Sequence, residues 1–295
     1  MTGIISKKLI YPAGSVESGL VEKASLDVQK FVGDHPTINA LSRHKPHLLI
    51  PSVYDLIFDK TMQGTVGEFL GCEFFMWFSV LFIKGKNSKG YVPWHYDDYF
   101  WATNYTAGCT AWLALETVDT DMGPMIFCDQ PIETYQHSID SESDNMLARG
   151  NVSDFSPPEG VEVHEACLKK GEFSIHSTDI WHSSKPNSSG KDRLAVAYRF
   201  ITADAEPQRF KFLKRGAVGN LRGSQFFYQE VRPQSEIGTR SQRQYRRSVR
   251  LSIFLQLFGD KRRSLIIQIK DLFLIVFSKK GLNVLSSLTR FIANR

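Results

Sequence analysis

The sequence of 295 residues has few cysteines and no long hydrophobic run. The four cysteines, Cys72, Cys109, Cys128 and Cys167, are widely spaced and form no CxxC pair, which is typical of reduced thiols in a cytoplasmic setting. No stretch reaches the roughly 18 uninterrupted apolar residues of a membrane span. The opening "MTGIISKKLIYPAG" has no apolar run long enough for a secretory signal. We therefore expect a cytoplasmic protein that is soluble or bound only to a surface.

The sequence also lacks internal repeats and low-complexity segments, and its composition of 42% hydrophobic and 12% aromatic residues is typical of a globular protein. Its charge is unevenly distributed. Residues 205–295 hold 19 basic and 5 acidic side chains, a net charge of +14 within a total of +5. This asymmetry predicts an acidic domain over residues 1–204 and a basic, amphipathic helical tail over residues 205–295.

Two stretches within the first 71 residues have helical periodicity. Residues 15–32 space their apolar side chains three and four apart after Ser15, and "IPSVYDLIFDKTMQGTVGEFLG" begins a second helical region, with Pro51 in its first turn. From residue 72 on, "CEFFMWFSVLFIK", "GCTAWLALETV", "GPMIFC", "GVEVHEACL", "GEFSIH" and "RLAVAYRFI" are short strand-like runs separated by turn residues. The pattern predicts a mainly β fold, a sandwich or barrel, with flanking helices. Residues 130–158 are polar and acidic and fit either a lid or a disordered loop.

One strand-like segment, "PWHYDDYFW", contains an HxD pair. Residues i and i+2 of a strand point to the same face, so His95 and Asp97 project side by side, whereas Asp98 points away. An imidazole and a carboxylate favour a borderline divalent ion such as Fe(II), and a second histidine would complete a facial triad. The alternative is a polar interruption in an aromatic strand.

A second segment, "GEFSIHSTDIWHSSKPNSSGKDRLAVAYRF", supplies the missing parts of such a site. A turn separates His182 from a strand that opens at Arg193, so the guanidinium can return toward the metal. A planar, always-charged fork at that position can bind a carboxylate through two hydrogen bonds. The sequence therefore predicts a metal site beside a carboxylate clamp.

The segments "PWHYDDYFW", "TAWLALETVDTDMGPM" and "WHSSKPNSSGKDR", in this order and spacing, resemble the phytanoyl-CoA dioxygenase family of Fe(II)- and 2-oxoglutarate-dependent oxygenases, including its ectoine hydroxylase-like branch. The resemblance runs from about residue 70 to 202. It implies a double-stranded β-helix, the cupin-like jelly roll, from about residue 70, with His95, Asp97 and His182 as catalytic iron ligands at its open end.

The same resemblance implies a co-substrate site. Arg193 matches the arginine that binds the far carboxylate of 2-oxoglutarate, Ser184 a serine near that carboxylate, and Trp112 a tryptophan that lines the pocket. The family's basic or amide residue on the strand before HxD has Lys84 as its one candidate. The chain departs from the family after "MGPM", where "IFCDQPIETY" replaces a sequence similar to "PGSH".

The resemblance also implies the chemistry, with O2 and 2-oxoglutarate as co-substrates and succinate and CO2 as products. Asp97 fills the position that related halogenases leave for chloride, so hydroxylation, desaturation or ring formation is favoured over halogenation. The substrate is expected to be a small-molecule or lipid-linked metabolite. The alternatives are a protein side chain, a carrier-bound acyl group, or a non-catalytic jelly roll that only binds.

Several residues near the motifs are candidates for substrate contact: Tyr96, Tyr99, Phe100, Trp101 and His176. Aromatic residues are more often part of a core, and His176 is interpreted as a pocket wall or a neighbour of the ligands rather than as a ligand. The remaining histidines have no spacing typical of metal ligands.

The basic tail alternates arginine clusters with apolar blocks, the longest of which, residues 265–277, is too short and too polar to span a bilayer. Residues 240–295 fit an anionic membrane surface, as a peripheral membrane protein would use; packing on the core or a dimer contact fits as well. The apolar blocks argue against nucleic acid as a partner.

Overall fold

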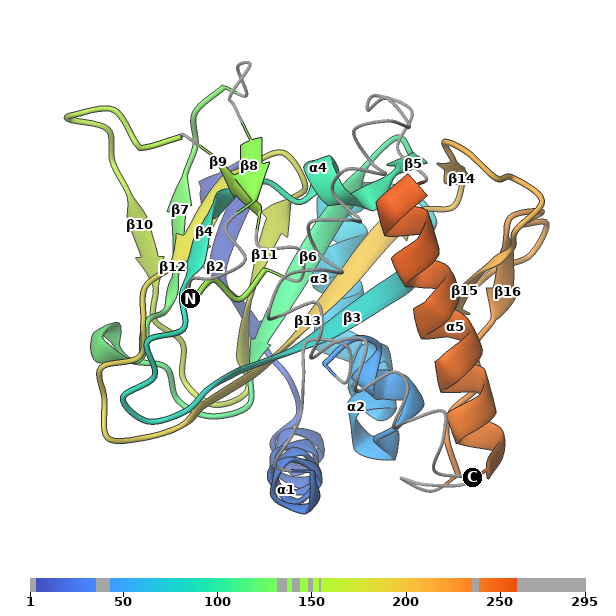
Figure 1. The fold of residues 1–295 in the computed structure, drawn as a ribbon, viewed down its shortest axis with the longest axis horizontal. Helices are drawn as coiled ribbons and strands as arrows, with labels where there is room; N and C mark the ends of the chain where they lie inside the picture. Colours follow the sequence, from blue (N-terminus) through green and yellow to red (C-terminus); the bar gives the residue numbers. More distant parts are fainter. Residues whose placement is uncertain are drawn as a thin grey trace.

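Two β-sheets lie face to face in the computed structural model (Figure 1), which describes residues 4–35, 43–131, 137–139, 144–147, 151–153, 155–234 and 239–258. The major sheet has the strand order β1 (Ile4–Ser6), β2 (Leu9–Ser15), β11 (Glu172–Ser177), β6 (Gly108–Ala114), β13 (Arg193–Thr202), β3 (Phe74–Lys84), β15 (Arg215–Gly219) and β16 (Phe227–Gln229). The minor sheet has the order β10 (His164–Ala166), β7 (Met125–Cys128), β12 (Trp181–Ser184) and β4 (Val92–His95). Two ribbons accompany them, β5 (Thr103–Asn104) with β14 (Glu206–Pro207) and β8 (His137–Ile139) with β9 (Asn151–Ser153). This arrangement confirms the predicted jelly-roll core.

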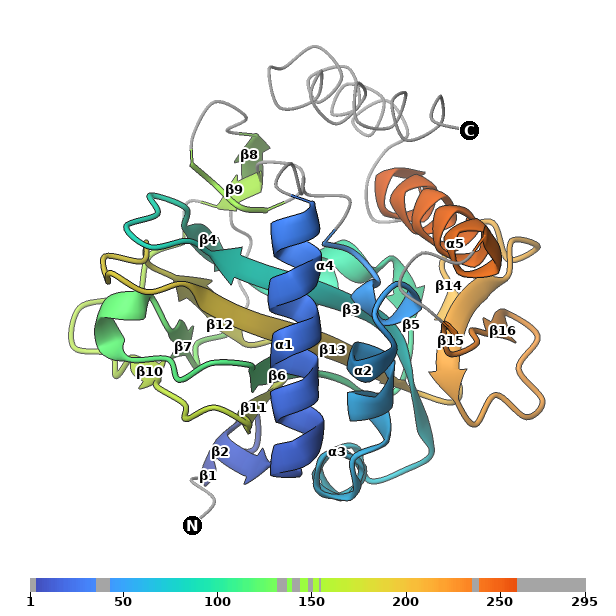
Figure 2. The same cartoon turned by 90° about the horizontal axis from the view of Figure 1, so that it is seen from below.

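Helices cover the outer face of the major sheet (Figure 2). They are α1 (Ser18–Asp34), the single turn η1 (Pro46–Leu48), α2 (Pro51–Asp55), the single turn η2 (Leu56–Phe58) and α3 (Lys60–Leu70). Apolar side chains of these helices and of the strands beneath them form one buried cluster. Elsewhere the chain forms α4 (Asp98–Trp101), the turn η3 (Thr120–Met122) and α5 (Thr239–Phe258). None of the helices in the described part of the chain is long and apolar enough to cross a membrane.

The sequence of β3 explains why it is central to the major sheet. It is apolar at almost every position because both of its faces are covered: Met76 and Leu81 pack toward the helices, while Phe78 and Val80 belong to a separate cluster on the other side. A continuous apolar run of this length is what a strand buried on two sides requires.

Helix α3 has a side-chain cap at its start, whereas helix α1 has none. The Asp59 side chain accepts a hydrogen bond of 3.0 Å from the backbone N–H of Met62, and α3 ends at Gly71, which takes a left-handed φ of 69°. The prediction that Ser15 caps the first helix is wrong, because Ser15 ends β2 and α1 begins at Ser18 with no side-chain cap. Strands β1 and β2, which extend the major sheet beside β11, were not predicted from the sequence.

The region after Asp204 begins with strands rather than helices. Strands β14, β15 and β16 lie within it, and β15 joins the major sheet beside β3. Helix α5 follows, and its side chains Tyr245 and Val249 are buried in the cluster beneath the helices. The predicted helical tail is therefore observed only from Thr239 to Phe258, and residues 259–295 lie outside the described residues.

Candidate metal centre

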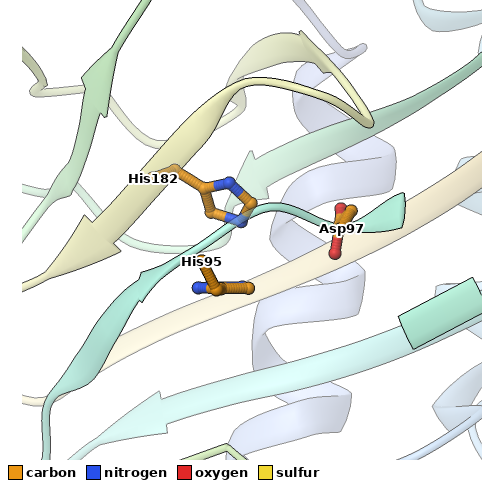
Figure 3. Close-up of side chains that lie close together, drawn as sticks. All are labelled: His95, Asp97 and His182. Carbon is orange, nitrogen blue, oxygen red and sulfur yellow. The ribbon is translucent and has the colours of Figure 1, made fainter. Parts of the chain in front are cut away.

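His95, Asp97 and His182 lie together where the minor sheet meets the start of α4 (Figure 3). Strands β4 and β12 are antiparallel neighbours in which His95 is directly opposite His182, so the two rings stand 4.1 Å apart, centroid to centroid. Asp97 follows two residues after His95 and immediately precedes α4. One donor atom of each of the three side chains lies within 4.8 Å of the others, and all three side chains are buried. The pairing of two strands thus assembles the predicted ligand set.

Backbone carbonyls fix the orientation of both imidazole rings. The Nδ1 atom of His95 lies 2.9 Å from the carbonyl oxygen of Pro93, and Nδ1 of His182 lies 3.1 Å from that of Ile180. A carbonyl only accepts, so each Nδ1 carries the proton and each Nε2 keeps its lone pair. Burial lowers the pKa of His95 to about 4 and that of His182 well below its usual value. Both rings are therefore neutral at pH 7, the form in which histidine binds a metal.

Asp97 is an ionised carboxylate held on two sides. Thr110 on β6 donates a hydrogen bond of 2.5 Å to its Oδ2 atom, and Nη2 of Arg199 on β13 lies 3.1 Å from Oδ1. Burial raises the pKa of a carboxylate, but the charge of Arg199 and the neighbouring histidines hold the pKa of Asp97 well below its ordinary value. Oδ1 is buried and has no hydrogen-bond partner among the described residues. A buried, ionised oxygen with free lone pairs fits a site that takes a cation.

The donor set of two imidazole nitrogens and one carboxylate oxygen fits Fe(II) and similar divalent ions. Three ligands from one side leave the remaining coordination positions open, as in the facial triad of non-haem iron enzymes. Within the described residues, this is the one group of at least three histidine, cysteine or acidic side chains arranged to hold a metal ion.

A second charged site lies at the other end of β13. Arg193 is the register partner of Lys84 on β3, and the two side chains are 1% and 0% exposed. Neither forms an ion pair with a described carboxylate. Burial lowers the pKa of Arg193 to about 9, and burial together with the charge of Arg193 lowers the pKa of Lys84 to about 6. A buried guanidinium beside a buried amine that can take up a proton, with no carboxylate of the described residues paired to either, forms a site that favours a negatively charged ligand.

The neighbours of these cations keep them in place. Lys84 donates a hydrogen bond of 2.8 Å to the Ser184 hydroxyl, and Arg193 stacks on Trp112 at 5.4 Å and donates to the carbonyl of Gly123. The Nε atom of Arg193 is buried and has no hydrogen-bond partner among the residues that the structure describes. Arg193, Ser184 and Trp112 thus lie together, as the resemblance implied, and Lys84 lies with them.

Gly123, in the sequence motif "MGPM", lies beside this cluster at a position where a side chain would not fit. Gly123 has a φ of 64°, and a Cβ atom there would overlap the backbone oxygens of Lys185 and Pro186. Only glycine accommodates both the left-handed backbone and the close approach. The motif thereby fixes the carbonyl that accepts the hydrogen bond from Arg193.

The candidate substrate residues near the HxD pair take different positions. Tyr96 packs against Trp181, which alternates with His182 along β12 and so faces the other side of the minor sheet. Trp101 is 1% exposed and packs on Trp77 in the core. Tyr99 contacts Tyr96 and Phe100, and the Phe100 ring lies 5.8 Å from that of His95. Phe100 therefore has a ring contact to a candidate ligand.

His176 lies beside the candidate ligands, as predicted. It is 1% exposed, its ring is 4.7 Å from that of His182, and its Nε2 atom is 3.7 Å from Oδ2 of Asp97. Neither ring nitrogen has a hydrogen-bond partner among the described residues. Asp98 does not join the ligands, because it accepts a hydrogen bond of 2.6 Å from the Tyr105 hydroxyl.

Sequence reasoning missed Arg199 and Thr110. The signal was present, since Arg199 follows Arg193 by six residues in one strand and Thr110 precedes Trp112 by two. Even spacing places each pair on the same face of its strand. Within residues 130–158, predicted as a lid or a disordered loop, 13 of 29 residues lie outside the described residues; Phe155, which is described, stacks on Trp181 at 4.0 Å.

Comparison with known proteins gives the same interpretation of the fold. The family model described as "Phytanoyl-CoA dioxygenase (PhyH)" matches residues 21–195. No curated protein sequence matches the chain.

Solved structures share the fold at low sequence identity. The non-haem monooxygenase ThoJ is 18% identical with a TM-score of 0.71, over 85% of this chain and 95% of ThoJ. The 2-oxoglutarate-dependent carbocyclase SnoK from nogalamycin biosynthesis is 16% identical with a TM-score of 0.53, over 65% of this chain and 78% of SnoK. The epimerase SnoN, solved with Fe3+, 2-oxoglutarate and nogalamycin RO, is 16% identical with a TM-score of 0.52, over 66% of this chain and 78% of SnoN.

Proposed function

The chain belongs to the phytanoyl-CoA dioxygenase family, and we propose that this non-haem iron, 2-oxoglutarate-dependent oxygenase hydroxylates an unactivated C–H bond of a small-molecule or lipid-linked metabolite. In this proposal His95, Asp97 and His182 hold Fe(II). Lys84, Arg193, Ser184 and Trp112 bind the carboxylate of 2-oxoglutarate that lies farther from the iron.

The main support for the proposal is that the candidate metal site and the anion site lie along the same strand, on the inner face of the major sheet. Arg193 and Arg199 both belong to β13 and are six residues, or about 20 Å of strand, apart. The first belongs to the buried cationic pair and the second contacts the ligand Asp97. The inward positions between them are Ala195 and Ala197, so the strand presents no bulky side chain between the anion site and the metal site.

The protein residues have distinct tasks in this reaction. The bound iron, with 2-oxoglutarate and O2, supplies the oxidising power, and succinate and CO2 are the products. The histidines remain neutral at neutral pH and present Nε2, while Asp97 contributes the negative charge that offsets part of the charge of the ion. The cationic pair fixes the co-substrate at its far end, which leaves only its near end free to move at the metal.

The direct test is the production of succinate from 2-oxoglutarate by purified full-length protein with Fe(II) and O2. Wild type is expected to form succinate slowly without substrate, and Asp97→Ala is expected to form none. If wild type neither turns over 2-oxoglutarate nor binds iron, the enzyme proposal fails and the chain is a binding module. A metabolite screen with the same readout identifies the substrate; stimulation only by proteins or acyl carriers would favour the alternative substrate class.

A peripheral membrane role for the tail is a separate part of the proposal. The described part of α5 exposes Arg243, Arg247, Arg250 and Phe254, and Phe212, 80% exposed, lies on the loop before β15. Phe210 on the same loop packs on Phe254, 5.1 Å between ring centroids. Basic and aromatic side chains on one helix and its neighbouring loop fit the interface of an anionic bilayer.

A further inference from the structure

Three polar residues form a row across the inner face of the major sheet. His176 on β11 is the register partner of Thr110 on β6, which is in turn the register partner of Arg199 on β13. Directly paired residues of neighbouring strands point to the same face. The row therefore runs across three adjacent strands toward the carboxylate of Asp97, to which all three residues lie close.

Only two members of the row restrain the carboxylate. Thr110 donates a hydrogen bond of 2.5 Å to Oδ2, and the guanidinium of Arg199 stands 3.1 Å from Oδ1. His176 is 3.7 Å from Oδ2, which is beyond hydrogen-bond distance. Because Oδ1 accepts no hydrogen bond from the described residues, Arg199 attracts it by charge and leaves its lone pairs available.

The guanidinium of Arg199 is itself held rigidly. It lies over the ring of Phe78 at 5.6 Å and over that of Trp101 at 5.9 Å. These ring contacts restrict where a long side chain can place its charge. Among the described residues, Arg199 is also the sole permanently charged side chain within ion-pair distance of Asp97. A fixed cation and a fixed hydroxyl thus define the plane and direction of the carboxylate.

We propose that Arg199 and Thr110 are positioning residues of the metal centre, which orient Asp97 so that it binds the ion through Oδ1. The inference rests on the proposed metal site and extends it to groups that do not touch the ion. Residues that orient metal ligands through hydrogen bonds or charge typically change metal affinity about 10- to 100-fold when they are removed. The expected effect here is of that size for Arg199→Gln.

The test uses Co(II) as a probe of full-length, metal-free protein. Its affinity is measured by titration, and its visible spectrum reports the ligand geometry independently of turnover. Arg199→Gln is expected to weaken Co(II) binding about 10- to 100-fold and to alter the spectrum, and Arg199→Lys, which keeps the charge, to recover part of both. Thr110→Val, which replaces the hydroxyl by a methyl group of similar size, is expected to alter the spectrum in the same way.

The matched control is Arg232→Gln, which breaks an ion pair between Arg232 and Asp55 of α2, one of the helices that cover the outer face of the major sheet (Figure 2). It is expected to leave affinity and spectrum unchanged. If Arg199→Gln has the same Co(II) affinity and spectrum as wild type, the inference is overturned. Tighter Co(II) binding by Arg199→Gln would also overturn it, because the main effect of Arg199 on metal affinity would then be repulsion between two positive charges rather than orientation of Asp97. If Arg199→Gln does not fold, the Co(II) spectrum of Thr110→Val is the test instead. A spectrum of that variant equal to that of wild type would overturn the inference.

Different results would refute the metal site and the positioning roles of Arg199 and Thr110. Wild-type protein that binds no Co(II), or binds it equally well after Asp97→Ala, would refute the metal site itself. Wild-type protein that binds Co(II) through Asp97 and forms succinate, with both positioning variants unchanged, would refute only the roles of Arg199 and Thr110.

Discussion

Lys84 lies directly opposite Arg193 in the pairing of β3 with β13, and burial together with the charge of Arg193 lowers the pKa of Lys84 to about 6. Without its ligand, the protein therefore holds Lys84 mostly uncharged at pH 7. In the proposed co-substrate site, the carboxylate of 2-oxoglutarate would favour the charged ammonium and raise that pKa on binding. The proposal therefore couples co-substrate binding to the uptake of a proton above pH 6.

The first prediction is that 2-oxoglutarate binds more weakly as pH rises from 6 to 8, by up to about tenfold per unit if only the ammonium form binds. Calorimetry of the Ni(II)-loaded protein in buffers of different ionisation enthalpy measures the protons taken up. Lys84→Met is expected to bind 2-oxoglutarate more weakly at pH 6 and to lose this pH dependence. A wild-type affinity that is flat between pH 6 and 8 would contradict the coupling.

The same shift has a consequence for stability with a definite sign. Because the pKa of Lys84 in the folded, ligand-free protein lies below its unfolded value of 10.5, the unfolded chain binds more protons between about pH 6 and 10.5. The contribution of Lys84 to the free energy of unfolding therefore rises with pH across that window. Urea unfolding of wild type and Lys84→Met at pH 6.5 and 9 measures this contribution. The free energy of unfolding of wild type is expected to rise relative to that of Lys84→Met between the lower and the higher pH.

Gly123 provides the second prediction. Gly123→Ala places a methyl group against the backbone oxygens of residues 185 and 186 and forces alanine into a positive φ. Both stability and the affinity for 2-oxoglutarate are expected to fall, because the carbonyl that accepts from Arg193 must move. Gly160→Ala is the matched control, since Gly160 also has a positive φ, 79°, but no atom lies within 4 Å of its added Cβ.

The control separates backbone strain from steric overlap. Gly160→Ala is expected to cost about 1 kcal/mol in unfolding free energy, the usual penalty for a positive φ, and to leave the KM for 2-oxoglutarate unchanged. Gly123→Ala is expected to cost several-fold more and to raise that KM. Equal effects of the two substitutions on stability and KM would show that the overlap at Gly123 relaxes without moving its carbonyl.

The third prediction concerns the two adjacent aspartates. Asp97→Ala is expected to weaken Fe(II) binding by more than about 100-fold, because it removes a direct ligand rather than a supporting contact. Asp98→Ala removes the acceptor of the Tyr105 hydroxyl but no ligand. It is expected to lower stability by about 1 kcal/mol while metal binding persists. Equilibrium dialysis with metal analysis checks both variants, and loss of metal from Asp98→Ala alone would reverse the assignment.

Much of this site could be predicted because its chemistry is local in sequence. His95 and Asp97 are two residues apart, and one short connection joins the strand of His182 to the strand of Arg193, so spacing alone indicated their proximity. The prediction that His95 and Asp97 share one strand is wrong, because β4 ends at His95 and Asp97 immediately precedes α4. The pairing of Lys84 with Arg193 depends on the register of strands that are about a hundred residues apart in the chain. Likewise, Arg199 and Thr110 lie together beside Asp97 because two neighbouring strands, β13 and β6, align these residues across the sheet. Periodicity predicts the face of a residue but not its partner.

The C-terminal region illustrates the same limit. Its charge predicted a separate basic tail, but charge does not report the buried contacts of a few residues. Glu230 is fully buried and accepts hydrogen bonds from Lys45, at 2.9 Å, and from Ser248 of α5, while Nε2 of His47 lies 3.0 Å from it. Burial raises the pKa of a carboxyl, but Lys45 and His47 outweigh it and lower the pKa of Glu230 to about 2. This cluster joins the residues after β16 to the segment before β3.

The final prediction follows from that cluster and concerns two shortened chains. A chain that ends at Asp204 loses β15 and Glu230 and leaves Lys45 as a buried cation without its carboxylate. Breaking a buried pair in this way costs about 3–5 kcal/mol, against a typical total stability of about 5–15 kcal/mol. We expect this chain to be unfolded or aggregated, as checked by circular dichroism.

A chain that ends at Phe258 keeps Glu230, Ser248 and α5, and is expected to melt cooperatively and to form succinate. It is therefore the appropriate partner for the full-length protein in a sedimentation assay with anionic vesicles: binding by the full-length protein alone would assign membrane attachment to residues 259–295, and binding by neither would refute the membrane role.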